Sequence, residues 1–268
     1  MNIWDTLFLN PLLNGLILFY KVSGDLGVAI VLFTVFIRFL LIPLTLPSLR
    51  TAQKMRELAP YLERLKQRHK DDKTKLAQAQ MELYKQHNVN PASGCLPQII
   101  QVVILIALFQ VFFKTLAADS LVGVKINEFL WPLLRLPEDA VMSTRFLYLD
   151  LLRPDVFHLS FLPLPIPGIF LLLSAVVQLL SSKMMMPEVT KEAKVAKKTP
   201  GAADDLAVSM QQSMLWVFPL MTLVIGFQFP SGLVLYWVVF SAFQMVQQYL
   251  MSGWGGLTPL ARRIGLVK

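Results

Sequence analysis

Five apolar stretches, each close to the length that crosses a lipid bilayer, constrain this chain more than any other feature. They cover residues 26–46, 97–116, 166–183, 214–229 and 233–250 of 268. A helix needs about 20 apolar residues to span the hydrocarbon core, and only the fourth stretch is clearly shorter. Charged residues make up 16% of the chain, against about 25% in soluble domains. The sequence therefore predicts an all-α integral membrane protein with five transmembrane helices.

The basic residues predict the orientation of these helices. Residues 50–85 carry ten of them: Arg50, Lys54, Arg56, Arg64, Lys66, Arg68, Lys70, Lys73, Lys75 and Lys85. Further basic residues lie in 184–213 and in the tail, whereas 117–165 carries only Lys125, Arg135, Arg145 and Arg153. Cytoplasmic loops are enriched in Lys and Arg, so we expect an extracytoplasmic N-terminus and a cytoplasmic C-terminus.

The predicted plan has ten parts. They are an extracytoplasmic, interfacial amphipathic segment (1–24), a first span (25–47), a cytoplasmic helical hairpin (48–96), a second span (97–116), an extracytoplasmic interfacial loop (117–165), a third span (166–184), a cytoplasmic linker (185–213), a fourth span (214–230), a fifth span (231–250) and a short cytoplasmic tail (251–268).

The cytoplasmic segment 48–96 has the pattern of two paired helices. Leucines and other apolar residues recur at helical spacing before and after the polar stretch KDDKT, which favours an antiparallel hairpin. Pro60 is expected in the first turn of its helix, where proline is tolerated. Two solvated helices that merely connect spans remain an alternative.

Arg38 is the one charged residue inside the sequence FTVFIRFLLIPLT. At 1.5 Å per residue it lies about 16 Å from Gly27 and about 12 Å from Leu46, near the middle of the span. A central charge costs about 2.5–3.5 kcal/mol on insertion scales, and none of the five spans contains Asp or Glu. Arg38 therefore either faces a water-filled cavity or awaits an acidic group from another molecule. Snorkelling of its side chain to the headgroups is the simpler alternative.

Polar residues recur at helical spacing on several spans and favour the cavity. Thr34 lies one turn before Arg38 on the same face. The other stripes contain Gln98 and Gln101; Ser174, Gln178 and Ser181; and Trp237, Ser241, Gln244 and Gln248. Each stripe alone could equally join two helices by hydrogen bonds. Together with an unpaired arginine, they predict a shared hydrophilic groove.

Nothing in the sequence indicates an enzyme. The three histidines, His69, His87 and His158, are not spaced as metal ligands, and no nucleotide-binding or hydrolase motif is present. We expect no catalytic residues, no metal and no cofactor. Cys95, the single cysteine, is expected to be a packing residue.

Four motifs give the chain a specific resemblance. FTVFIRFLLIPLT, LKQRHKDDKTKLAQAQMELYKQHNVNP, GCLPQIIQ and FPSGLVLYW stand in the order and spacing of the YidC family of membrane-protein insertases, over residues 25–250. The resemblance implies five spans around a groove that is closed on the outside, with a cytoplasmic hairpin after the first span. It places Arg38 as the groove arginine, Thr34 as the polar residue one turn before it, and Trp237 as an aromatic that contacts substrate.

The resemblance also implies partners and a location. The substrates would be nascent membrane proteins within the lipid bilayer of the bacterial plasma (inner) membrane. The Sec translocon, the signal recognition particle pathway and the ribosome are further expected partners, with no specific nucleic acid. The large extracytoplasmic domain of many relatives and the long basic tail of some are not seen here, so ribosome docking would use the hairpin residues Arg64, Lys66, Arg68, Lys70, Lys73 and Lys75.

The expected function is insertion and folding of hydrophobic segments that carry short polar or acidic tails. The groove residues would be Arg38, Thr34, Gln101, Ser174, Gln178, Trp237, Ser241 and Gln244. Two other functions stay open: a structural assembly factor for membrane complexes, and a small-anion transporter. The transporter is disfavoured because no inverted repeat is visible.

Overall fold

The computed structural model of the chain describes residues 2–69, 72–90, 96–116, 126–140, 142–161, 164–185 and 203–266. Most of these residues are helical, which confirms the expectation of a mainly α-helical chain. The α-helices are α1 (Asn10–Ser23), α2 (Leu26–Arg68), α3 (Lys73–Gln86), α4 (Leu96–Gln110), α6 (Ile169–Met185), α8 (Ala203–Gly226), α9 (Ser231–Ser252) and α10 (Thr258–Arg263). Short π- or 3₁₀-helical segments are η1 (Asp5–Leu9), η3 (Val111–Leu116), η4 (Pro132–Leu134) and η6 (Gly255–Leu257).

Two small antiparallel pairs complete the secondary structure. β1 (Arg145–Phe146) pairs with β2 (Leu149–Asp150), and β3 (Val156–Phe157) pairs with β4 (Ile166–Pro167). All four strands lie between α4 and α6. The first three fall in the predicted extracytoplasmic loop (117–165), whereas β4 occupies the first residues of the predicted third span (166–184).

Two described helices are long and apolar enough to cross a membrane: Leu26–Arg68 and Ser231–Met251. Three shorter apolar helices, Ile99–Phe113, Ile169–Met185 and Leu215–Gly226, fall on the other expected spans. The chain is thus consistent with an all-α membrane protein, while the five-span arrangement stays a prediction.

The described residues form two compact units. The first contains Met1–Leu41, Ile99–Val177 and Leu220–Phe243, and the second contains Ile42–Gln98, Gln178–Pro219 and Gln244–Lys268. The first unit has a continuous apolar core. Its members come from α1, α2, α4, η3, the segment before α6, and α9, and they include Leu13, Ile30, Phe112, Leu151 and Leu233, each at most 4% exposed.

The segment between α4 and α6 contributes more to this core than its expected place along the interface suggests. Ile126 and Leu151 are fully buried, although Leu133 is 89% exposed. Asn14, itself 0% exposed, holds the segment to α1. Its Nδ2 donates to the Phe129 carbonyl at 3.0 Å, and its Oδ1 accepts from the Trp131 N–H at 2.7 Å.

The same segment fixes the starts of two helices. The backbone N–H groups of Ser231 and Gly232, at the start of α9, donate to the carbonyls of Arg153 (2.7 Å) and Leu151 (3.0 Å). Asp155, 3% exposed, accepts from the Leu171 N–H near the start of α6 at 2.8 Å. These contacts satisfy N–H groups that a helix leaves without internal partners.

Local signals explain two further helix boundaries. Gly24 ends α1 with a φ of 73°, a left-handed conformation that suits glycine. Asp72 begins α3, because its side chain accepts from the Lys75 N–H at 3.0 Å. That hydrogen bond, together with one from the Lys75 side chain, lowers the pKa of the Asp72 carboxyl.

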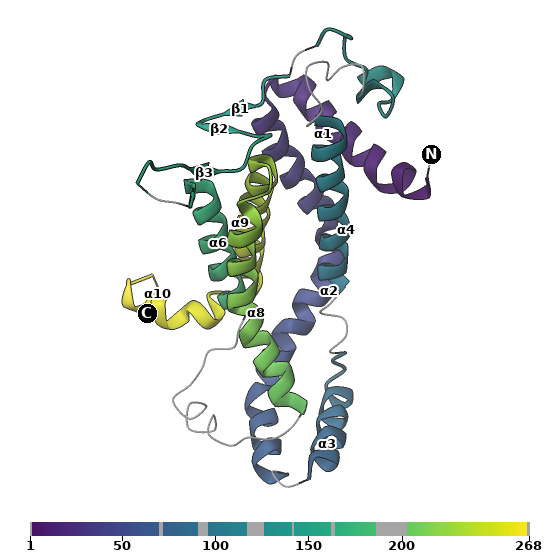
Figure 1. Cartoon of the computed structure of the whole chain (residues 1–268). Helices are drawn as coiled ribbons and strands as arrows, with labels where there is room; N and C mark the ends of the chain where they lie inside the picture. Colours follow the sequence, from purple (N-terminus) through teal and green to yellow (C-terminus); the bar gives the residue numbers. More distant parts are fainter. Residues whose placement is uncertain are drawn as a thin grey trace. The chain divides into compact units, whose positions relative to one another are not determined.

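In the second unit, α3 runs back alongside the last turns of α2 (Figure 1). Leu58 and Leu76 are buried at 4% and 3% exposure, and the rings of Tyr61 and His87 lie 6.4 Å apart. The Lys75–Asp72 ion pair at 3.2 Å is solvent-exposed and adds little stability. A helical pair after the first expected span is therefore present.

Two boundaries differ from the sequence-based expectation. Pro60 lies inside α2 together with Pro43 and Pro47, so its expected place in a first helical turn is wrong. The helix simply continues from the apolar stretch into the charged one. In addition, α8 starts at Ala203, inside the expected linker 185–213, because the residues before the apolar stretch extend its helix.

Replacing Asp155 by alanine is expected to destabilise the first unit. The Leu171 N–H and the Tyr148 hydroxyl, which donates to Asp155 at 3.0 Å, would lose a buried charged acceptor, at a cost of about 2–3 kcal/mol. Denaturant unfolding in detergent micelles measures the change. Asp139→Ala, at an exposed position of the same segment, is the control, and equal midpoints for the two variants would contradict this role of Asp155.

Candidate functional site

Arg38 lies on α2 in the first unit and is only 9% exposed. Thr34, one turn earlier, is 2% exposed, and its hydroxyl donates to the Ile30 carbonyl of the same helix at 2.6 Å. The two residues that the sequence places on one face of the span are therefore both buried, and the threonine hydroxyl is satisfied within its own helix.

Aromatic rings of α9 surround the guanidinium. Its Cζ atom lies 4.1 Å from the centre of the Phe240 ring and 5.3 Å from that of Phe243. Phe243 also makes an edge-on contact of 5.1 Å with Phe39, the neighbour of Arg38 on α2. Cation–π contacts of this kind are worth about 0.5–2 kcal/mol, more where water is excluded.

The guanidinium has no anionic partner in the part of the chain that the structure describes. Its Nε atom is buried without a hydrogen bond. A buried cation normally has an ion pair or several hydrogen bonds, because removing it from water is costly. Arg38 thus combines burial with an unused hydrogen-bond donor.

A partly buried hydrogen bond joins α4 to α9 in the same unit. Gln101 donates from Nε2 to the Tyr236 hydroxyl at 3.0 Å, and Tyr236 is 4% exposed. Tyr236 is one turn before Phe240 on α9. The predicted groove residue Gln101 is therefore engaged with the helix whose rings cover Arg38.

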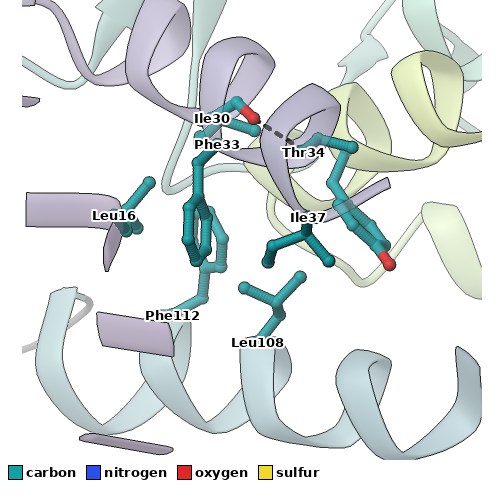
Figure 2. A pocket seen from close by; sticks show the side chains of 8 residues that line it. Leu16, Ile30, Phe33, Thr34, Ile37, Leu108 and Phe112 are labelled. Atoms are coloured by element: carbon teal, nitrogen blue, oxygen red, sulfur yellow. Dashed lines mark hydrogen bonds between the residues drawn. The ribbon is translucent and has the colours of Figure 1, made fainter. Parts of the chain in front are cut away.

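The small cavity beside Thr34 is apolar. It is lined by residues of α1, α2, α4, η3 and α9: Leu16, Ile30, Phe33, Thr34, Ile37, Leu108, Phe112 and Tyr236. Figure 2 shows the side chains of Phe33, Phe112 and Leu108 pointing into one space, with the Thr34 hydroxyl bonded to Ile30. The lining of this cavity is mostly apolar, so the cavity is not the predicted hydrophilic groove, which remains a proposal.

The other predicted groove residues fall in both units. In the first, Ser174 (1% exposed) donates to the Leu171 carbonyl at 2.7 Å, Ser241 is 4% exposed, and Trp237 stacks on Phe229 at 5.9 Å. In the second, Gln178 is half-buried and Gln244 donates to the Met185 sulfur at 3.6 Å. The structure places Arg38 against α9. That all eight predicted residues line one groove stays a proposal.

The hairpin residues form a basic surface in the second unit. Arg64 and Arg68 at the end of α2 and Lys75 on α3 are exposed, and Lys66 is partly so. Lys73 is the first residue of α3, and Lys70 lies outside the described residues.

Three residues at the site were not predicted: Tyr236, Phe240 and Phe243. They recur at i, i+4 and i+7 on α9, each one position before a residue of the predicted polar stripe. The signal was an aromatic stripe on the same span as the polar one, and it is this stripe that meets Arg38.

Comparisons with known proteins agree with this architecture. The model of the family described as 60Kd inner membrane protein matches residues 18–255. The membrane protein insertase YidC of Fusobacterium nucleatum is 32% identical over 231 residues, which cover 86% of this chain and 88% of that relative. The insertase MisCA of Bacillus subtilis is 31% identical over 94% of this chain and 80% of its own length. YidC of Pelagibacter ubique is 34% identical over 90% of this chain, which spans 38% of that longer relative.

The apolar helices are those of a helical membrane protein, and one of them carries a buried arginine without an anionic partner among the described residues. The extent of the family match identifies it further: the chain belongs to the 60Kd inner membrane protein family, whose relatives here are YidC and MisCA insertases. The resemblance stated from four sequence motifs is thereby confirmed.

Tyr236→Phe is expected to destabilise the protein by about 0.5–1.5 kcal/mol, because the partly buried amide of Gln101 would lose its partner. The double variant Gln101→Leu/Tyr236→Phe should recover part of this loss, since both partners become apolar. Unfolding midpoints in detergent micelles measure the changes. Tyr249→Phe on the same helix, where the side chain is 46% exposed, should be silent; equal losses in the single and double variants would contradict the pairing.

Proposed function

We propose that this protein is a membrane-protein insertase and chaperone of the bacterial inner membrane. The observation that carries the proposal is the buried guanidinium of Arg38, which has no anionic partner in the described ranges and lies on an apolar helix long enough to cross a membrane. Relatives that share about a third of its residues over most of the chain are named membrane protein insertases. The substrates are nascent membrane proteins, and the bilayer is the second partner.

The proposed topology has five spans, an extracytoplasmic N-terminus and a cytoplasmic C-terminus. It is supported by the five apolar helices of the described chain and by the ten basic residues of 50–85. The segment between α4 and α6 then covers the outer side, and α3 with the end of α2 forms the cytoplasmic hairpin.

In the proposed mechanism, a substrate with a short acidic tail approaches from the cytoplasm. Arg38 offers a counter-charge partway across the membrane, and the charge lowers the cost of bringing a carboxylate out of water. The membrane potential, about 2.3 kcal/mol per charge per 100 mV, draws the anionic tail outward. The substrate's apolar segment follows along the lipid-facing side chains and passes into the bilayer, where its burial is favourable. No bond is made or broken, so no catalytic residue is required.

The proposed polar path consists of Arg38, Thr34, Gln101, Ser174, Gln178, Trp237, Ser241 and Gln244. The support for it is chemical: each residue but Trp237 presents a hydroxyl, amide or guanidinium in an otherwise apolar helix. Gln101, Ser174 and Thr34 make internal hydrogen bonds, which a passing polar tail would exchange for bonds to itself.

Arg38→Ala should reduce insertion of a single-span substrate with an acidic N-terminal tail by at least about tenfold, because about 1.4 kcal/mol of attraction already corresponds to that factor. The measurement uses the purified protein in liposomes with a membrane potential and follows protease protection of the tail. An otherwise identical substrate with an amidated, neutral tail is the matched control.

Arg38→Lys separates charge from geometry. If planar, two-point capture of a carboxylate matters, lysine should fail on the acidic tail as alanine does; if charge alone matters, lysine should retain most activity. Equal insertion of the acidic tail by arginine, lysine and alanine would rule out a direct role of Arg38. It would favour a structural assembly factor that only holds partner subunits.

The exposed basic residues of the hairpin are the proposed contact for ribosomes. Arg64→Glu/Arg68→Glu should weaken co-sedimentation with ribosomes and make the remaining binding less sensitive to salt, because fewer phosphates would be neutralised. Arg135→Glu/Arg145→Glu, in the segment proposed to lie outside, is the control. Unchanged binding by the hairpin variant would redirect the search to the Sec translocon or the signal recognition particle pathway as cytoplasmic partners.

A further inference from the structure

We infer that the C-terminal segment, residues 254–266, is an amphipathic anchor that binds the anionic phospholipid surface beside the end of α9. The segment contains η6, α10 and the turn that follows α10. The inference goes beyond the proposed insertase activity and rests only on the membrane location of the chain. Three features carry it: the fold of the segment, its exposed apolar side chains and its charge.

The chain turns at the end of α9, which is an apolar helix long enough to cross a membrane. Gly253 has a φ of 64°, and its N–H donates to the Tyr249 carbonyl at 2.9 Å, which ends the helix. The Trp254 ring packs edge-on against Tyr249, with ring centres 5.0 Å apart. Figure 1 shows α10, in yellow, leaving α9 sideways. The segment therefore starts where the membrane helix ends and can lie along the bilayer surface.

The segment is an ordered element, although the sequence predicts only a short tail. The N–H of Gly265, which has a φ of 76°, donates to the Arg262 carbonyl at 3.2 Å. The N–H of Leu266 donates to the Ala261 carbonyl at 2.9 Å. These two bonds form the Schellman arrangement that closes helix ends. The side chains of α10 thus have defined directions, so its faces can be compared.

An apolar stripe runs along the segment and is only half covered. It recurs at i, i+3, i+4 and i+7, the spacing of an amphipathic helix: Leu257, Leu260, Ala261 and Ile264. Leu257 and Ala261 are 4% and 2% exposed, whereas Leu260 and Ile264 are 45% and 63% exposed. The protein therefore buries one half of the stripe and leaves the other half open. An interfacial helix buries such a face at the boundary between headgroups and acyl chains.

The charge of the segment matches an anionic surface. The charged side chains of residues 252–268 are all basic: Arg262, Arg263 and Lys268. Both arginines are exposed. Basic residues beside an apolar face bind anionic headgroups while the apolar side chains enter the lipid. Ribosomal phosphates would use the arginines but would leave the exposed leucine and isoleucine in water, so the combination favours a lipid surface.

The test follows the segment in the full-length protein in lipid nanodiscs. Cys95→Ala/Leu266→Cys provides one site for the fluorophore nitrobenzoxadiazole near the end of the segment. Neutral lipids with a nitroxide in the upper acyl chain quench a label that lies in the bilayer. Quenching should be about threefold stronger in discs with about 30% phosphatidylglycerol than in phosphatidylcholine discs, because anionic headgroups attract basic residues near the surface. High salt should reduce the difference.

Charge variants identify the side chains responsible. Arg262→Gln/Arg263→Gln should remove most of the difference between the two lipid compositions. Arg262→Lys/Arg263→Lys keeps both charges and should retain it, which separates lipid attraction from any structural role of the arginines. Arg135→Gln/Arg145→Gln removes the same charge from exposed positions between α4 and α6 and is the matched control.

An apolar variant tests the other half of the proposal. Leu260→Ser/Ile264→Ser leaves the charge unchanged but should weaken quenching in the anionic discs, because less apolar area enters the lipid. Wild-type quenching in this variant would overturn the anchor and favour ribosomal RNA as the partner of the arginines.

Two further results would also contradict the anchor: equal quenching in neutral and anionic discs, and an unchanged difference after Arg262→Gln/Arg263→Gln. The measurement contains no insertion substrate. Its failure would therefore leave the insertase proposal standing, and failed insertion of acidic tails would leave the anchor standing.

Discussion

A guanidinium that is 9% exposed, without an anionic partner in the described part of the chain, has lost much of its hydration, and its neighbours must compensate part of that loss. Here the compensation comes from the aromatic faces of α9, with Phe240 at 4.1 Å and Phe243 at 5.3 Å. Rings compensate a cation weakly compared with a carboxylate. The site is therefore held in a state that an anion can improve, and this imbalance links the packing of α2 against α9 to the proposed recognition of acidic tails.

The helices were predictable from the sequence because apolar stretches and local caps are encoded over a few residues. The α3 helix begins after the polar turn, at Asp72, as the sequence indicates, and each apolar stretch coincides with an apolar helix. The segment between α4 and α6 was harder to predict. Its buried residues, such as Ile126 and Leu151, pack against distant parts of the chain, and their pattern has no regular period. Pro60 misled the prediction because a long helix can accommodate a proline that propensity alone places at an end.

The site was predictable in its charged centre and not in its surroundings. Arg38 and Thr34 could be found because a charge in an apolar run has few explanations. The polar residues of the other spans predicted Gln101. They did not point to Phe240 and Phe243, because phenylalanine in a membrane helix normally faces lipid or core. Only the relative rotation of α2 and α9 determines which side of α9 meets the guanidinium, and no single-helix pattern contains that information.

The hydrogen bonds around residues 150–155 have a mechanical consequence. They attach the first turns of both α6 and α9 to the same short segment. The N–H groups of Leu171, Ser231 and Gly232 donate to acceptors in residues 151–155. A helix pinned at one end moves least there and increasingly further along its axis. Phe240 is nine residues, or about 13 Å, beyond Ser231. A tilt of about 10° around this attachment would therefore move the helix at Phe240 by about 2 Å, and the hydrogen bond from Gln101 to Tyr236, five residues into α9, opposes such a tilt.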